Sequence, residues 1–415
     1  MTVRASPRSL DFIRENAAFL SAGALLTFLS SFGQTFFISI FSGEIRAAFG
    51  LSHGAWGTLY AAGTFMSALV MLWAGQLTDV MRVRSLCLVV LPALALACLG
   101  MALAPTAWVL VPLIFALRFF GQGMASHIAT VAMARWFVAT RGRALSVASL
   151  GFAIGEAVLP VAFVALMALV AWQWLWVLAA LLVLLAIPVL GRLLSMERTP
   201  SAAASGAFSA GMEARHWSRT EVLRHWLFWA MVPFVIGPAA FSTAFFFHQV
   251  HFAETKALSH LTLVSLFPLY TAGAIAMMLL SGFLIDRYGT APLMPLCQLP
   301  MVAAFAILAV DGGAAGVALG MAMMALTVGA NHTLSAAFWA EFYGTQHIGA
   351  VKAMAAAVMV FGTAIGPILT GVLIDRGVSF DTQLIGIAGW FAAASALTAF
   401  ATARAARALS YPRAR

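Results

Sequence analysis

Two charged residues, Arg118 and Glu156, stand deep inside long apolar stretches of the sequence. Arg118 lies 17 residues before Arg135, and Glu156 lies 13 residues after Arg143. At about 1.5 Å of rise per residue, these spacings correspond to about 25 Å and about 20 Å along a helix, which is a similar depth for antiparallel neighbours. A charge in the core of a bilayer costs at least about 2.5–3.5 kcal/mol, so each of the two is a functional candidate.

The chemistry open to this pair has two forms. Arg118 could bind an anion while Glu156 exchanges a proton, because desolvation disfavours the charged form of a carboxyl group. Alternatively, Arg118 and Glu156 form a permanent structural pair that joins two helices. Both interpretations follow equally from the spacing.

Uncharged polar residues recur at helical spacing in other apolar stretches. Gln34 follows two hydroxyl residues at steps of three and four, and Gln122 follows Arg118 by four. Asn331 lies between two hydroxyl residues at steps of four, with His332 beside it. Since residues three or four apart share one helix face, these side chains could line a cavity, or each could make a hydrogen bond between helices.

Metal and cofactor sites are not indicated. The spacing His248-x-x-His251-x-x-Glu254 puts three metal-ligand types on one helix face, but no fourth ligand is nominated. The cysteines stand in apolar stretches without a paired spacing, which excludes a disulfide framework: Cys87, Cys98 and Cys297. No nucleotide-binding loop occurs, and we expect neither a metal nor a bound cofactor.

The elements that carry these residues are predicted to be membrane helices. The 415 residues are 63% hydrophobic and 9% charged, whereas soluble domains carry about 25% charged residues. Backbone polar groups cannot stay unpaired in lipid, so apolar stretches of this length must be helices. We predict an all-α membrane protein with twelve spans, at about 17–41, 53–77, 84–104, 107–134, 143–168, 172–194, 226–250, 260–285, 291–310, 313–340, 349–374 and 382–403.

Charge sets the predicted orientation. Nearly all Lys and Arg residues fall on one side of these spans, and only Arg46, Lys256 and Arg376 fall on the other. The positive-inside rule then makes both termini cytoplasmic. The net charge of +9 reflects this topology and does not indicate a nucleic-acid partner.

A polar connection divides the chain into two sets of six spans. We predict an N-terminal bundle at 1–194, a cytoplasmic linker at 195–224 and a C-terminal bundle at 225–415. Within the linker, Ser218-Arg219-Thr220-Glu221 fits a capping box that would begin a short surface helix.

The two bundles are predicted to be copies of each other. One offset of 207 residues maps Gly75 onto Gly282, and the same offset then holds over three regions, for the pairs Asp79 and Asp286, Gly142 and Gly349, Gly155 and Gly362, and Pro160 and Pro367. Copies with six spans each keep one orientation, so their axis runs along the membrane normal. This arrangement is typical of transporters with a substrate site between the halves.

The repeated segment also carries a family motif. The second copy has Gly282, Leu284, Asp286, Arg287 and Gly289, and the first has Gly75, Leu77, Asp79 and the basic Arg84. In these residues the chain resembles the major facilitator superfamily of secondary transporters. The resemblance implies a cavity lined by spans one, four, seven and ten. It also implies a cytoplasmic latch for the outward-open state, formed by Gly75, Asp79, Arg84, Gly282, Asp286 and Arg287.

Two narrower resemblances point to different substrates. The run Arg135-Trp136-Phe137 with Arg141-Gly142-Arg143-Ala144 is similar to the monocarboxylate and oxalate/formate branch, although that branch usually has an Arg in span eight, which is absent here. The run Arg118-Phe119-Phe120-Gly121-Gln122-Gly123 resembles a motif of proton-driven drug antiporters.

We therefore expect alternating-access transport of a small organic anion with protons or a counter-substrate. Arg118, Gln34, Gln122, Asn331 and His332 would bind substrate, and Glu156 would couple protons. Efflux of drug-like amphipathic compounds is the alternative, and a non-transporting receptor or a membrane enzyme are remoter ones. The expected setting is a monomer in the inner membrane of a bacterium.

Overall fold

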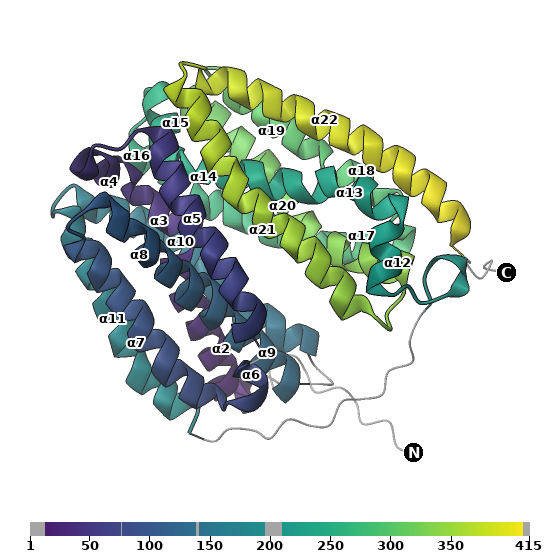
Figure 1. Ribbon diagram of the computed structural model, residues 1–415, viewed down its shortest axis with the longest axis horizontal. Helices are drawn as coiled ribbons and strands as arrows, with labels where there is room; N and C mark the ends of the chain where they lie inside the picture. Colours follow the sequence, from purple (N-terminus) through teal and green to yellow (C-terminus); the bar gives the residue numbers. More distant parts are fainter. Residues whose placement is uncertain (1–12, 76, 138–140, 196–209, 410–415) are drawn as a thin grey trace. The chain divides into compact units, whose positions relative to one another are not determined.

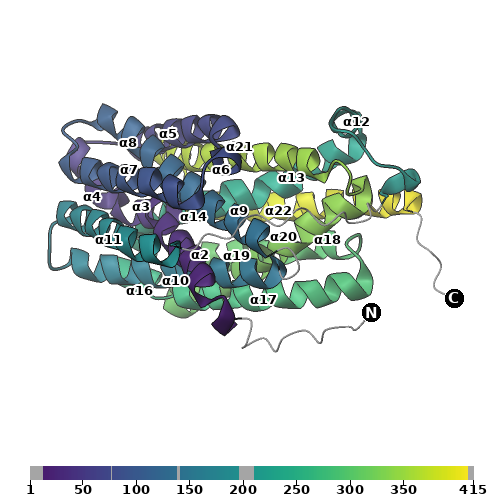
Figure 2. The same cartoon turned by 90° about the horizontal axis from the view of Figure 1, so that it is seen from below.

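The computed structural model describes residues 13–75, 77–137, 141–195 and 210–409, and every element in this part is a helix (Figures 1 and 2). The fold class predicted from composition is therefore correct. The chain forms two compact units by contact, of which unit 1 comprises Met1–Phe41 and Ala62–Ser205 and unit 2 comprises Ser42–Ala61 and Gly206–Arg415. The segment Ser42–Ala61 thus packs with unit 2, although it precedes most of unit 1 in the sequence.

Unit 1 is built from helices that follow one another with short turns. They are α2 (Ala17–Ser30), η1 (Ser31–Gly33), α3 (Thr35–Ile38), η2 (Ser39–Phe41), most of α5 (His53–Ala74), α6 (Leu77–Val80), α7 (Val83–Leu103), η3 (Ala107–Val109), α8 (Leu110–Ala116), η4 (Leu117–Ala125), α9 (Ser126–Trp136), α10 (Arg141–Met167) and α11 (Trp172–Leu193).

Unit 2 begins with α4 (Ser42–Phe49) and the first residues of α5. It continues with η5 (Met212–Ala214), α12 (Arg219–Arg224), α13 (Trp226–Gly237), η6 (Pro238–Ser242), α14 (Thr243–Phe247), α15 (Gln249–Thr255), α16 (His260–Val264), α17 (Phe267–Tyr288), α18 (Leu293–Cys297), α19 (Leu299–Ala309), α20 (Gly313–Tyr343), α21 (Ile348–Asp375), α22 (Phe380–Ala405) and η7 (Ala406–Ala408).

Nine helices in the described ranges are long and apolar enough to cross a bilayer, or ten if the bent pair Ala17–Gly33 and Thr35–Phe49 is one span. The other two predicted spans correspond to α5, with 22 residues, and to the shorter apolar run Leu293–Ala309. These lengths and compositions are those of membrane-spanning helices, and the count of twelve spans stays a prediction.

The internal repeat is visible in the backbone. The first helix of the N-terminal copy breaks at Ser31–Gln34, and its counterpart 207 residues later widens into a π-helix at Pro238–Ser242. Gly155 of α10 packs against the first break, since a Cβ there would lie 2.1 Å from Ser31 Oγ. Gly362 of α21 packs against the second, where a Cβ would lie 3.1 Å from Ile236 O. Small residues let backbones approach closely in membranes, so each repeated glycine marks the same contact.

Proline explains part of the second break. Pro238 has no N–H group, so the carbonyl of Phe234 loses its usual helical donor. The side chain of Gln298, buried between α18 and α19, donates to that oxygen at 2.7 Å. The buried side-chain amide of Gln298 thus replaces the backbone hydrogen bond that Phe234 O lacks.

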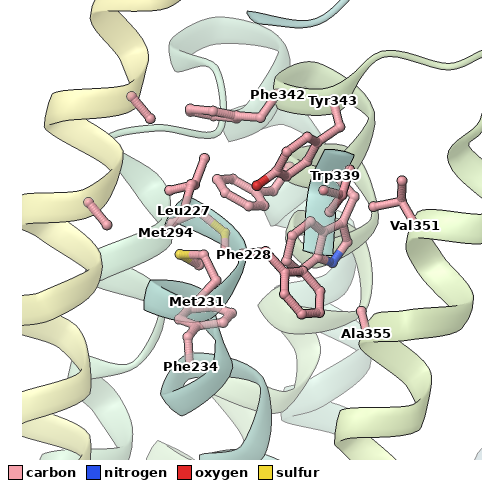
Figure 3. Close-up of a cluster of buried hydrophobic side chains, with 14 of the residues drawn as sticks. Leu227, Phe228, Met231, Phe234, Met294, Trp339, Phe342, Tyr343, Val351 and Ala355 are labelled. Atoms are coloured by element: carbon pink, nitrogen blue, oxygen red, sulfur yellow. The ribbon is translucent and has the colours of Figure 1, made fainter. Parts of the chain in front are cut away.

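The end of the linker is folded onto unit 2. Phe228 of α13 and Trp339, Phe342 and Tyr343 of α20 form a buried cluster (Figure 3), which Trp217 of the linker completes. The N–H of Trp217 donates to Tyr343 O at 3.1 Å, and Gly211 lies too close to Phe342 O for any Cβ. Burial of the linker side chains contributes hydrophobic stabilisation here.

The predicted capping box is present. Glu221 accepts from the Ser218 N–H at 2.8 Å and from the Ser218 hydroxyl at 2.6 Å, and α12 follows. These hydrogen bonds, together with Arg215 nearby, hold the pKa of Glu221 below its ordinary value. The earlier linker residues 196–209 lie outside the described part of the chain.

Candidate functional site

The break in the first helix is the centre of the candidate site in unit 1. After η1, Gln34 adopts an extended backbone with φ −85° and ψ 153°, and the helix axis bends by 49°. Non-helical backbone at membrane depth is tolerated where it is buried in protein or lines a water-filled cavity. The side chain of Gln34 is half-buried at this point.

Arg118 is held at this break. It lies in η4, a π-helical segment, and its side chain is 3% exposed. Its Nη1 donates to Gly33 O at 3.2 Å and to Thr35 Oγ1 at 3.3 Å. Two oxygens from the broken helix therefore orient the guanidinium group.

Two glycines allow the contact. A Cβ on Gly33 would lie 2.1 Å from Leu117 O and 2.6 Å from the N atom of Gln122. A Cβ on Gly121 would lie 2.8 Å from Gly33 Cα. Any side chain at either glycine would push η4 away from the break, so Arg118 reaches Gly33 O only because both are glycine.

Glu156 approaches the same break from α10. It directly follows Gly155, the residue that touches Ser31, and it is half-buried. Sequence spacing predicts Arg118 and Glu156 at similar depth, and their helices both contact residues 31–35. The segments that carry Arg118, Gln34 and Glu156 thus pack together in unit 1, and Gln122 lies half-buried beside Gly121.

The remaining predicted substrate residues lie in unit 2, on α20. Asn331 is half-buried, and within the described part of the chain its Oδ1 atom is buried without a hydrogen-bond partner. His332 is exposed. A buried acceptor without a donor costs free energy, which makes Asn331 a candidate to receive a hydrogen bond from a ligand.

Some residues of the polar stripes make contacts between helices. Thr327 donates to Cys297 O at 2.7 Å, and Thr27 donates to Ala148 O. For these two residues the alternative of an interhelical hydrogen bond is correct, because a hydroxyl group beside a carbonyl is satisfied without solvent.

The first motif copy is anchored by α9. His127 Nε2 lies 3.1 Å from Gly75 O, and Arg135 donates to Thr78 O. The side chain of Asp79 lies outside the described part of the chain, and Arg84 is exposed at the start of α7.

The second copy lies at the end of α17. Asp286 is exposed, and the Arg287 guanidinium lies 5.4 Å from the ring centre of Tyr288. The Thr290 N–H donates to Glu341 Oε2 at 3.1 Å, and this bond ties the loop to α20. Gly282 is half-buried, and no atom lies within 4 Å of a Cβ built there.

Sequence reasoning missed Gly33, Thr35 and Gly121 as parts of the site. A signal was present, because glycine in a helix interior costs up to about 1 kcal/mol relative to alanine and indicates a close backbone approach. The group His248, His251 and Glu254 is not arranged as a metal site: among the described residues, no cluster of three such ligands could hold an ion.

Comparison with known proteins identifies relatives of the fold. Residues 23–367 match the family model for the Major Facilitator Superfamily. No curated protein matches the sequence significantly.

Two solved structures illustrate the likeness. The inward-facing, unoccupied structure of a bacterial homologue of the human lysosomal transporter Spinster has a TM-score of 0.70 at 14% identity, covering 98% of this chain and 100% of the other. The nucleoside transporter NupG has a TM-score of 0.69 at 13% identity, covering 93% of this chain and 99% of the other.

Proposed function

This chain belongs to the Major Facilitator Superfamily and is a membrane-embedded transporter rather than an enzyme, and from that premise we propose that it moves a small organic anion together with protons. Transport would proceed by alternating access, in which the two six-helix halves rock around a central site. A monocarboxylate is the substrate class that the sequence resemblance favours. The setting we propose is a monomer in the inner membrane of a bacterium.

The observation that carries the anion proposal is the placement of Arg118. A guanidinium group stays charged in proteins and presents planar N–H donors that match a carboxylate. Here it is almost fully buried, and two neutral oxygens of the broken helix orient it. A bound carboxylate would meet these planar N–H donors at a point where water is scarce.

Glu156 is our candidate for proton coupling. It directly follows Gly155, on the helix that packs against Ser31. When a carboxylate substrate occupies Arg118, a nearby negative charge on Glu156 becomes unfavourable, so a proton would bind with the anion. This order of events makes the transport step close to neutral in charge.

Polar groups of both bundles complete the proposed substrate site. Gln34 and Gln122 would contribute donors from unit 1, and Asn331 and His332 would contribute from unit 2. The buried Oδ1 of Asn331 supports this role, because a substrate donor would satisfy it. At the cytoplasmic face, Gly75, Asp79, Arg84, Gly282, Asp286 and Arg287 would form the latch of the outward-open state.

Binding and counterflow in proteoliposomes test the proposal. We expect monocarboxylates to raise the melting temperature of the wild type and to drive counterflow, and we expect both effects to be lost in Arg118→Ala. Arg224→Ala is the matched control, since Arg224 is an exposed arginine at the end of α12 and should leave both unchanged. Stabilisation by amphipathic drugs but not by anions would overturn the substrate class and favour efflux, and stabilisation by nucleosides alone would also overturn the substrate class.

The proton role has a separate measurement. Glu156→Gln should retain anion exchange but lose the acceleration of net uptake by an inward proton gradient. Full retention of that acceleration would remove Glu156 from the coupling step while leaving the role of Arg118 intact.

A further inference from the structure

A carboxylate at one end of α21 caps a helix from the other half of the sequence. Asp375, the last residue of α21, accepts from Ser52 Oγ at 2.6 Å, from the His53 N–H at 3.0 Å and from the Gly54 N–H at 2.8 Å. Asp375 and its three partner residues all belong to unit 2, because Ser42–Ala61 packs there. The predicted topology puts this contact on the outer face, opposite the cytoplasmic motifs.

The chemistry of the contact is that of a helix cap supplied by another helix. The first N–H groups of α5 have no acceptor within α5, and its N-terminus carries partial positive charge. Ser52 supplies the ordinary cap, with its Oγ accepting from the Ala55 N–H at 3.1 Å. Asp375 satisfies the two N–H groups in between and neutralises the end of the helix.

Glycine residues allow α5 and α21 to approach closely enough for these hydrogen bonds. A Cβ on Gly57 would lie 2.8 Å from Pro367 O, and one on Gly371 would lie 2.7 Å from His53 O. A Cβ on Gly54 would lie 3.3 Å from the backbone of Val372. The outer ends of α5 and α21 therefore meet backbone to backbone, and no larger side chain fits between them.

Aromatic packing continues the contact towards the membrane centre. Trp56 is fully buried and lies 5.6 Å from the ring of Phe247, in a stacked arrangement. Tyr60 lies 4.6 Å from the same ring. The Trp56 indole donates to Ser42 Oγ at 3.0 Å, so the start of α4 is held in the same contact.

The helix that is captured here also runs into unit 1. α5 is one unbroken helix from His53 to Ala74, and the boundary between the units falls between Ala61 and Ala62. If transport requires the two units to rock, α5 must either bend or leave α21 at its outer end. We propose that Asp375 is an outer latch, a positioning residue that keeps the outer face closed and releases α5 when the substrate site opens outward. This inference rests on the alternating-access mechanism proposed above.

The exposure of Asp375 suits a reversible contact. Its carboxylate lies at the surface, so water can replace each hydrogen bond as α5 departs. At Gly54, Gly57 and Gly371 no side chain has to move when the two helices separate.

Cysteine accessibility tests the latch. The native cysteines Cys87, Cys98 and Cys297 are all buried, so they give a low background. In Ala61→Cys the reporter replaces a side chain of α5 that is 4% exposed. We expect Asp375→Ala to raise the rate at which a membrane-impermeant thiol reagent labels this cysteine from outside by at least fivefold, and Asp375→Glu to restore the slow rate.

A matched control separates latch from surface charge. Asp311→Ala removes another exposed carboxylate of unit 2, which pairs with Lys256 and not with α5, and should leave the labelling rate unchanged. An unchanged rate in Asp375→Ala would overturn the latch.

Cross-linking supplies the second test. Ser52→Cys with Asp375→Cys should form a disulfide that abolishes counterflow, and a reductant should restore counterflow. Full counterflow in the cross-linked protein would overturn the latch. Loss of counterflow in the wild type as well would instead refute the proposed transport, whatever the labelling rates show.

Discussion

The position of the Arg118 side chain depends on neighbouring residues that carry no charge themselves. Its guanidinium is oriented by the carbonyl of Gly33 and the hydroxyl of Thr35, neither of which is charged. Those acceptors exist because the first helix breaks at Gln34, and the distance closes because Gly33 and Gly121 lack side chains. A buried arginine can therefore serve as a binding site only where nearby backbone and side-chain acceptors hold its guanidinium group in place.

A methyl group at Gly33 should displace η4, and with it Arg118, from the break in the first helix. We expect Gly33→Ala to lower the free energy of unfolding by about 1–3 kcal/mol, because the added Cβ overpacks against Leu117 O. Anion-dependent stabilisation should fall in parallel, since η4 and Arg118 must move. Thermal unfolding with and without substrate measures both.

Gly191→Ala is the control for helix propensity. Nothing lies within 4 Å of a Cβ there, so the substitution should be neutral or slightly stabilising, by up to about 1 kcal/mol. Equal effects at the two glycines would contradict the argument from close approach.

At the scale of elements, α15 adds a titratable group to the outer contact. His251 of α15 packs its ring 4.5 Å from that of His53, at the start of α5. Burial lowers the pKa of His251 below its ordinary value; Glu254 opposes this shift, and Arg46 adds to it. His248 also faces His53, with ring centres 5.8 Å apart.

External acid should therefore loosen the outer contact. When α5 leaves, His251 becomes hydrated and recovers a pKa near about 6.5. The packed arrangement is then fully favoured above that value and is lost progressively as pH falls through it towards the lowered pKa. We expect labelling of Ala61→Cys to accelerate between about pH 7 and pH 5.

The measurement needs correction for the thiol itself, because the fraction of thiolate changes with pH. A cysteine at the exposed position of Leu169 supplies that correction. In His251→Gln the acceleration should diminish, and an undiminished acceleration would assign the effect to another group.

The whole molecule is expected to balance two sets of contacts. Asp375 would hold the outer face closed, whereas Asp79 and Asp286 belong to motifs that resemble a cytoplasmic latch. In alternating access these contacts compete, since only one face is open at a time.

Opposite substitutions should therefore shift the balance in opposite directions. We expect Asp79→Ala or Asp286→Ala to slow outer labelling of Ala61→Cys, because the outward-open state loses its latch. Asp375→Ala should speed the labelling, and the double variant Asp79→Ala with Asp375→Ala should return close to the wild-type rate. Labelling rates that fail to change in Asp79→Ala would reject the cytoplasmic latch while leaving the outer one standing.

The composition and the internal repeat predict the fold class from the sequence alone. The low charge and long apolar stretches predict an all-helical membrane protein, because lipid offers the backbone no other partner. The repeat of Gly155 in Gly362 predicts two related bundles, and both glycines occupy corresponding contacts. The capping box at Ser218 could also be predicted from the sequence, because it depends only on Ser218 and on Glu221 three residues later.

Tertiary structure decided which polar residues meet. Thr27 and Thr327 share a stripe with Gln34 and Asn331 in the sequence, yet each is satisfied by a carbonyl of a neighbouring helix. The place where the first helix breaks depends on its packing against η4 and α10, which local sequence does not report. The helical spacing of residues shows which side chains share one face of a helix. It does not show which other helix packs against that face.

The sequence by itself determined the class of molecule, its two related halves and the two charges worth examining, because composition, periodicity and repetition are properties of the sequence and do not depend on how the helices pack. The structure alone decided that Arg118 is held by a broken helix and that Asp375 caps α5 across 321 residues. Both are contacts between backbone groups and distant side chains, and their geometry exists only once the helices have packed.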